Sequence, residues 1–340
     1  MTLSDNLISY AAGAYQSADW LCRQQKPDGS IGKAYGIAGI YKTMLALVTT
    51  GRIGAANALL TWAKNNVMTA PGEFHAIGEG DFDKSQCGYR NIFIMLGAYR
   101  TGRYDIVSKE AFSRILDYMH PSGGFFAHTD DKVDQPMNFL FSDMGAWLSL
   151  AFGRHDVAVK TGDLMIRMLK EQPEIDERLY VQYSPKKDSL ITDVPDGQEN
   201  VYYIEANHPE QHFYHCGVTA GFLTELYEAT GGKKYLEAAK EYMEFTLITT
   251  EKSYEWPSKC KEGWGAAQVY RVTKDPRYRE VAEKVAEKTF LHSKWREDDH
   301  WAEFMIPIGE ERFRLCNIEL TAEFTWELME IVKGLASVPE

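Results

Sequence analysis

The chain has 340 residues, of which 44% are hydrophobic, and a formal net charge of −12 with acidic and basic residues interspersed. A chain of this length and composition can bury a large core, and the lack of clustered Lys and Arg disfavours nucleic acid and anionic membranes as partners. The cysteines form no C-x-x-C pair, and neither a signal peptide nor a membrane span is evident, so we expect a cytoplasmic protein with reduced thiols.

Helices are predicted in pairs that recur at intervals of roughly 50 residues. The first helix of each pair is almost uniformly apolar and the second is amphipathic, which indicates an inner and an outer helix. The pairs span residues 35–50 and 55–65, 89–101 and 108–119, 138–152 and 157–170, 213–230 and 234–247, and 263–272 and 278–290. The first helices end at Thr50-Gly51, Thr101-Gly102, Gly153, Thr230-Gly231 and, in a looser copy, Thr273-Lys274.

Two further helices, over residues 5–24 and 317–335, have no partner next to them in the sequence. The first is amphipathic and the second is mostly apolar, so they fit as the outer and inner members of a sixth pair. The pattern therefore predicts an all-α fold: a single (α/α)6 toroid or barrel of about twelve helices that occupies residues 1–340 as one domain. We expect the N-terminal helix to pack beside the C-terminal one and the inner helices to line a central cup.

Residues 179–205 interrupt the helical repeat. The runs Leu179–Tyr183 and Val201–Glu205 are rich in β-forming residues, and a turn-rich segment with Asp196-Gly197 separates them. We predict a short β-hairpin-like insertion that lies where the inner helices begin and covers the mouth of the cup.

Asp143 is the first candidate catalytic residue, because it stands inside the apolar segment Phe139–Trp147. When the repeats are aligned on the residue that ends each inner helix, the equivalent positions are uncharged: Tyr41, Ile92 and Gly221. A buried carboxyl has a raised pKa and suits a general acid. The structural alternative is that Asp143 joins two helices through a hydrogen bond.

His212 and His215 are candidate proton carriers at the start of the fourth inner helix, with His208 just before them. Metal binding with Cys216 or Cys260 is an alternative, but no ligand set has a recognised spacing, so we predict no metal. A further alternative is one surface histidine and one buried histidine with satisfied hydrogen bonds.

The loops that lead into the inner helices are rich in polar and aromatic residues, whereas those at the other end are short turns. Asp83 is a candidate catalytic residue in one of them, with a solvated or helix-capping role as the alternative. The expected substrate-binding residues are Tyr35, Arg90, Phe126, Glu205, Tyr214 and Trp264. For Trp264, core packing is the alternative, and Glu319 and Glu323 on the last helix either face the cup or pair between helices.

The segment Gln25-Lys26-Pro27-Asp28-Gly29-Ser30-Ile31 resembles the Q-x-x-D-G-S-W repeat of terpenoid cyclases and related α-toroids, and Gly123-Gly124-Phe125 looks like a degenerate second copy. The resemblance implies the α-toroid fold. It does not include the D-x-D-D acid motif of cyclases, to which Asp81-Phe82-Asp83-Lys84 comes nearest, or the zinc ligands of prenyltransferases. Six-hairpin glycosidases, including unsaturated uronyl hydrolases, are similar in architecture and carry carboxylates and stacking aromatics in their cups.

Together these features predict a cofactor-free acid–base enzyme, a cyclase, isomerase or dehydratase, that acts on an apolar terpenoid- or polyketide-like small molecule. Such chemistry resembles that of the linalool dehydratase-isomerase type of α/α barrel. Asp143 would be the acid, and His215 or His212 the partner base. One alternative is a glycoside hydrolase that pairs Asp143 with Asp83 or Glu205, and another is a toroid that binds a ligand or protein without catalysis. The sequence leaves the oligomeric state open.

Overall fold

The structure is a computed structural model that describes residues 3–31, 39–75, 86–129, 132, 134–291, 301 and 311–338, with the backbone alone for 311–316. The chain divides into two compact units. The first unit comprises Met1–Tyr118 and Lys294–Met329, and the second comprises Met119–Ser293 and Glu330–Glu340. The single domain that the sequence predicts over residues 1–340 stays a prediction, and each unit is described by itself. Within the described residues, no helix is both long enough and apolar enough to cross a membrane.

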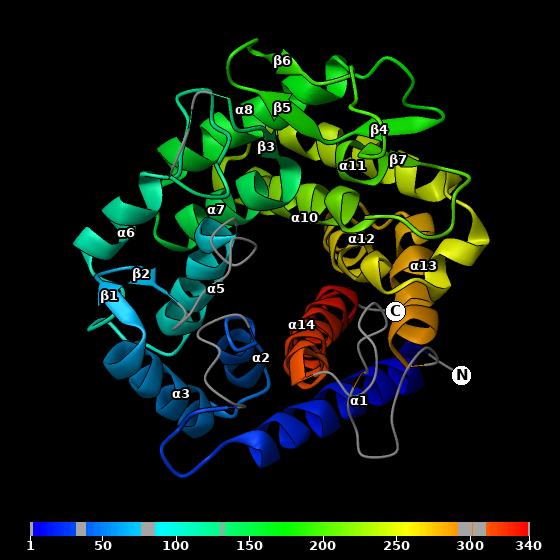
Figure 1. Ribbon diagram of the computed structural model, residues 1–340. Helices are drawn as coiled ribbons and strands as arrows, with labels where there is room; N and C mark the ends of the chain where they lie inside the picture. Colours follow the sequence, from blue (N-terminus) through cyan, green and yellow to red (C-terminus); the bar gives the residue numbers. More distant parts are fainter. Residues whose placement is uncertain are drawn as a thin grey trace. The chain divides into compact units, whose positions relative to one another are not determined.

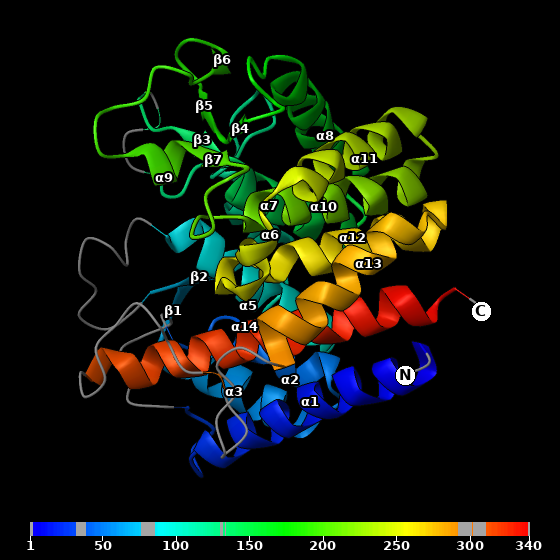
Figure 2. The same ribbon diagram turned by 90° about the vertical axis from the view of Figure 1, so that its right-hand side faces the viewer.

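The first unit is built from helices and one small sheet (Figure 1). Its elements are α1 (Leu3–Gln24), α2 (Thr43–Thr49), α3 (Ile53–Asn66), β1 (Met68–Ala70), β2 (Glu73–Phe74), α5 (Cys87–Arg100), α6 (Lys109–Leu116) and most of α14 (Glu311–Ala336). Helix α2 packs against α3 and α5, and nearly every residue of α5 is buried. Both views show α1 running beside α14, as the sequence predicts for the two terminal helices (Figures 1 and 2).

The second unit contains three further helix pairs. Its helices are α7 (Phe139–Ala151), α8 (His155–Lys170), α9 (Glu199–Tyr202), α10 (Tyr214–Thr230), α11 (Lys233–Ile248), α12 (Cys260–Thr273) and α13 (Pro276–Lys284). Two 3-10 helices, Glu251–Glu255 and Pro257–Lys259, precede α12. Helix α10 packs against both α7 and α12, so these three inner helices form the core of the unit, and α8, α11 and α13 each pack against the inner helix that precedes them.

The contact between α10 and α12 depends on glycine. A Cβ atom on Gly217 would lie 2.1 Å from the carbonyl oxygen of Lys261, and one on Gly265 would lie 2.3 Å from the carbonyl oxygen of Gly217. Cβ atoms do not approach oxygen so closely, so only glycine allows the two helix backbones to meet at this distance.

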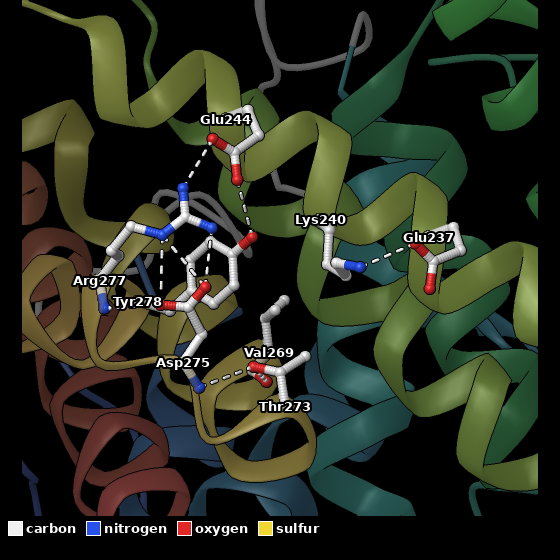
Figure 3. Close-up of polar contacts among 8 residues, drawn as sticks. All are labelled: Glu237, Lys240, Glu244, Val269, Thr273, Asp275, Arg277 and Tyr278. Atoms are coloured by element: carbon white, nitrogen blue, oxygen red, sulfur yellow. Dashed lines mark hydrogen bonds and ion pairs between the residues drawn. The ribbon is translucent and has the colours of Figure 1, made fainter.

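The turns between the paired helices share a left-handed residue, which explains the signal in the sequence. Gly51, Gly102, Gly153 and Gly231 have φ angles of 78°, 72°, 69° and 73°. Lys274 takes the same conformation, with φ 62°, and confirms the looser fifth copy. In that turn the Thr273 hydroxyl donates to the carbonyl of Val269 at 2.8 Å, and the Asp275 carboxylate accepts from the Arg277 amide at 3.0 Å (Figure 3). The first bond occupies a carbonyl in the last turn of α12, and the second caps the start of α13.

The predicted helices match the observed ones closely, with two departures. Helix α2 begins only at Thr43, after turn residues 39–42, and residues 32–38 lie outside the described part of the chain. The predicted helix over 278–290 is observed, but its second half belongs to the π-helix Val285–Leu291. A Cβ on Gly263 would lie 2.6 Å from a methyl group of Val285, so the π-helix packs directly against a glycine of α12.

The insertion is confirmed, but it holds more strands than a hairpin. Strand β4 (Arg178–Tyr180) pairs antiparallel with β7 (Tyr203–Glu205), so the two predicted β-rich runs do meet. Strand β5 (Gln182–Ser184) pairs with both β3 (Met137–Asn138) and β6 (Ser189–Leu190). Because β3 leads directly into α7 and β7 precedes α10, the insertion lies at the end of the second unit where its inner helices begin, as predicted.

The segment that resembles the Q-x-x-D-G-S-W repeat forms a turn that occurs three times. Each turn closes with an antiparallel bridge between its first and seventh residues: Gln25 with Ile31, Met68 with Phe74, and Met119 with Phe125. The fifth residue is a glycine with positive φ, and its Cβ would lie 2.4–2.5 Å from a carbonyl oxygen of the following outer helix: Gly29 against Ala58, Gly72 against Ala111, and Gly123 against Lys160. The copy at Gly72 was not identified from the sequence, because it retains only the glycine and the closing aromatic residue.

Candidate functional site

Asp143 lies in the interface between α7 and α10 and is fully buried. Its Oδ2 atom accepts a hydrogen bond of 2.5 Å from the Thr219 hydroxyl of α10, and its Oδ1 atom has no hydrogen-bond partner among the described residues. Burial raises the pKa of Asp143 well above its ordinary value, and the bond from Thr219 opposes this rise only in part. Asp143 is therefore a carboxyl buried between two inner helices, and this burial favours its protonated form.

His215 lies in the same interface, one helical turn before Thr219. The ring of Phe139, one turn before Asp143 on α7, meets the His215 ring edge-on at 6.1 Å. The contacts of Asp143 with Thr219 and of Phe139 with His215 place Asp143 and His215 on facing helices. The two residues are offset by about one turn, or roughly 5 Å, along the interface. His215 is 3% exposed, and burial lowers its pKa well below the ordinary value, so the imidazole is neutral.

Two partly exposed aromatic rings connect His215 with the surface. The His212 ring stacks on Tyr214 at 5.4 Å, and Tyr214 lies 4.6 Å from the His215 ring. Burial lowers the pKa of His212, and a hydrogen bond with the backbone of Asn200 opposes this effect only in part. The ammonium group of Lys261 lies 5.6 Å from the Tyr214 ring centre. Three of the predicted site residues thus form one group at the start of α10, and Lys261 is a neighbour that the sequence did not indicate.

Two other predicted residues of the second unit have side chains that contact residues outside this group. Phe126 is buried and contacts the His120 ring edge-on at 5.7 Å. Glu205 is partly exposed in β7 and forms an ion pair of 3.1 Å with Arg178 of β4. No substrate-binding role for either side chain follows from these contacts.

Trp264 is fully buried, which favours the packing alternative over stacking on a ligand. Its ring lies 5.1 Å from that of Trp147, and a Cβ on Gly221 would lie 3.1 Å from its indole. The bulky side chain on α12 occupies the space that glycine leaves on α10. Of the remaining predicted residues, Asp83 and Tyr35 lie outside the described part of the chain.

The first unit contains a separate charged cluster around Arg90. This residue is 3% exposed in α5, and its guanidinium lies 5.7 Å from the ring centre of Tyr41. The Tyr41 hydroxyl donates a short hydrogen bond to Glu319. The Lys42 ammonium contacts Glu319 at 3.1 Å and Glu323 at 2.7 Å. The pairing between helices expected for the two glutamates is therefore confirmed, although Lys42 was not identified as their partner.

No family model matches the sequence, and no curated protein matches it. Solved structures similar to it include a D-mannose isomerase, with a TM-score of 0.69, 12% identity and coverage of 98% of this chain and 99% of that one. A cellobiose 2-epimerase from Spirochaeta thermophila has a TM-score of 0.66, 12% identity, and coverage of 98% and 99%. An α-1,6-mannanase of Salegentibacter sp. has a TM-score of 0.61, 13% identity, and coverage of 96% and 99%.

These likenesses extend over nearly the whole of each chain and establish the fold class. The protein has the α/α-toroid fold that the sequence predicts, the architecture of six-hairpin glycosidases and sugar epimerases. At such low identity the likeness concerns the fold alone. The prediction that the protein uses no metal and no cofactor stays a prediction.

Proposed function

We propose that the protein is a cofactor-free acid–base enzyme that isomerises or epimerises a sugar. The observation that carries this proposal is that His215 and Asp143 are both buried on facing helices about one turn apart, where burial lowers the pKa of His215 and raises that of Asp143. The similar structures support the substrate class, because their names are those of enzymes that act on carbohydrates. The apolar terpenoid- or polyketide-like substrate that the sequence suggests receives no such support, so a sugar replaces it.

The proposed reaction needs a base and an acid at the same time. A proton on the carbon next to a sugar carbonyl is removed by a base that is neutral at physiological pH, and His215 meets this condition. The electron pair left on carbon forms an enediol when the carbonyl oxygen receives a proton, which the Asp143 carboxyl can supply. Return of a proton to the neighbouring carbon gives the isomer, and return to the opposite face gives the epimer. His212 is the second candidate donor, and Tyr214 the candidate substrate contact.

Exchange of carbon-bound sugar hydrogen with solvent deuterium tests the proposed reaction directly. D-mannose and cellobiose are incubated with the protein in D₂O, and the product and its carbon-bound deuterium are followed by proton NMR. We expect deuterium on the former carbonyl carbon if the sugar is isomerised, or on the carbon next to the carbonyl if it is epimerised. We also expect a loss of rate of roughly 10²-fold or more in His215→Gln and Asp143→Asn. His155→Gln removes an exposed histidine at the start of α8 and serves as the control. If neither sugar gains deuterium or changes, the proposed reaction is wrong for these substrates.

The pH dependence gives a second test. Because the pKa of His215 lies well below its ordinary value of 6.5, the base stays neutral as the pH falls through 6.5. The value of kcat/KM should therefore stay flat in this range and decline only at lower pH. A decline centred on pH 6.5 would mean that a solvent-exposed histidine is the base.

A glycoside hydrolase is the second candidate. One similar structure is an inactive variant of a mannanase in which two adjacent Asp residues are replaced by Asn, and another is an unsaturated glucuronyl hydrolase. Asp143 has the raised pKa that a general acid requires. Its partner carboxylate would be Asp83, outside the described residues, or Glu205, which is paired with Arg178. Release of reducing ends from α-1,6-mannotriose without carbon-bound deuterium would favour this alternative, and sugar binding without turnover would favour a binding protein.

A further inference from the structure

A single hydroxyl group holds the backbone on both sides of His212. Ser258, in the 3-10 helix Pro257–Lys259, donates a short hydrogen bond to the carbonyl oxygen of Gln211. The same hydroxyl accepts a hydrogen bond of 3.2 Å from the amide of Phe213. The two peptide groups that flank His212, just before the first turn of α10, are therefore bound to one side chain that lies 45 residues away from Phe213 in the sequence.

The residues of the histidine segment do not supply this support themselves. Phe213 is the N-cap residue of α10, and its side chain makes no capping hydrogen bond. The Gln211 side chain is bound instead to the amide and carbonyl of Glu205, each at 2.8 Å. Phe213 is fully buried, so its amide would lose its hydrogen bond inside the protein if the Ser258 hydroxyl were removed.

The residue that follows Ser258 is held by buried polar contacts. This residue, Lys259, forms a fully buried ion pair of 2.6 Å with Glu262 in the first turn of α12. Its ammonium also donates to the Thr249 hydroxyl at 2.6 Å and lies 4.3 Å from the Phe213 ring centre. The backbone that carries Ser258 is therefore anchored to α12 and Thr249 through the buried ammonium of Lys259.

We propose that Ser258 is a positioning residue that sets the geometry of His212 and His215 at the start of α10. The inference rests on the proposed function in one respect, namely that His215 is the base. A displacement of about 1 Å at a reacting group can cost about 10²-fold in rate, so a small shift of this turn would be visible in catalysis.

The first test compares Ser258→Ala with Ser258→Thr in the sugar-exchange assay. We expect Ser258→Ala to lower kcat by roughly 10- to 100-fold with KM changed by less than about three-fold, because the turn moves while the rest of the site remains. Ser258→Thr keeps the hydroxyl and should restore most of kcat. Ser149→Ala is the matched control, since it removes a buried hydroxyl that donates to the Gly145 carbonyl within α7.

The second test does not depend on activity. The imidazole of His215 is titrated by NMR in the wild-type protein and in the alanine variants at Ser258 and Ser149. We expect the pKa of His215 to rise toward its ordinary value in Ser258→Ala alone, because a loosened turn admits water to a ring whose pKa is lowered by burial.

The outcomes separate the two proposals. If the wild-type protein exchanges no sugar hydrogen, the proposed function fails and the titration alone decides the role of Ser258. An unchanged His215 titration in Ser258→Ala overturns the positioning role. So does a loss of kcat that Ser258→Thr fails to restore, or one that follows a lowered melting temperature.

Discussion

Replacement of Asp143 by Asn removes one titrating proton from the α7–α10 interface, and the stability of the variant should depend on pH in a calculable way. In the unfolded chain the carboxyl ionises near its ordinary pKa of 3.8, whereas burial raises the pKa in the folded protein well above this value. Between the two pKa values the folded state holds a proton that the unfolded state has released. The stabilisation from the protonated carboxyl is therefore complete below pH 3.8 and is lost as the pH rises toward the folded pKa.

The size of the effect follows from linkage. Each pH unit between the unfolded and folded pKa values removes about 1.4 kcal/mol from the free energy of unfolding of the wild-type protein. Asn does not titrate, so Asp143→Asn lacks this loss. Over two pH units within that range, the variant should gain about 2.7 kcal/mol relative to the wild type. This gain is opposed by a cost of about 1–3 kcal/mol that does not change with pH, because the variant must bury an extra amide N–H beside Thr219.

Urea unfolding followed by tryptophan fluorescence at several pH values between 4 and 7 measures this difference. The expected result is a difference between variant and wild type that changes with pH while the m-value stays the same. Thr219→Val is the control, because it removes the hydrogen bond to Asp143 and keeps the carboxyl. A difference that is constant over this range would show that Asp143 is ionised in the folded protein, and the reasoning about its pKa and its role as an acid would be refuted.

Three substitutions test other features of the structure. Lys274→Gly should stabilise the protein by about 0.5–1 kcal/mol in urea unfolding, because Lys274 has a positive φ that glycine adopts without strain; a destabilised variant would contradict this. Gly217→Ala should destabilise the protein by about 3 kcal/mol or more and lower its melting temperature, because the added Cβ would lie 2.1 Å from the Lys261 carbonyl oxygen. A melting temperature near that of the wild type would disprove the close contact between α10 and α12. Lys42→Met should lower the free energy of unfolding by about 2–4 kcal/mol, because it removes the ammonium group that contacts both Glu319 and Glu323. An unchanged free energy of unfolding in urea would mean that water already screens the two carboxylates.

The helical fold could be predicted because the inner helices are apolar and five of them end at a left-handed residue. The residue at that turn forces the chain to reverse, so Gly51 and its equivalents mark the helix boundaries almost to the residue. The alignment singled out Asp143 as the charged residue of an apolar helix, and the structure has it buried against α10. Strand β3 was missed because its two residues have little β-propensity and are held by pairing with β5, a contact distant in sequence.

The candidate site was harder to predict, because its contacts join elements far apart in the chain. The Thr219 hydroxyl reaches Asp143 only because α7 and α10 pack in one particular register. Ser258 acts from a 3-10 helix that has no motif, and nothing in its local sequence distinguishes it from other serines. Trp264 is the opposite case. An aromatic residue at the start of a predicted inner helix is compatible with both a ligand contact and a core position, and the packing of its indole against Gly221 favours the core.

The three bridged turns at Gly29, Gly72 and Gly123 bear on how freely such a chain can change. All three turns share a glycine that fits against a carbonyl group and a buried apolar residue that closes the bridge, whereas the hydrogen-bonding side chains Gln25 and Asp28 belong to the first turn. The features common to the three turns are therefore two positions, and the backbone path is the same although the other residues differ. A search for further members of this architecture would do better to look for a glycine and an apolar residue two positions later, recurring between outer and inner helices, than for overall identity.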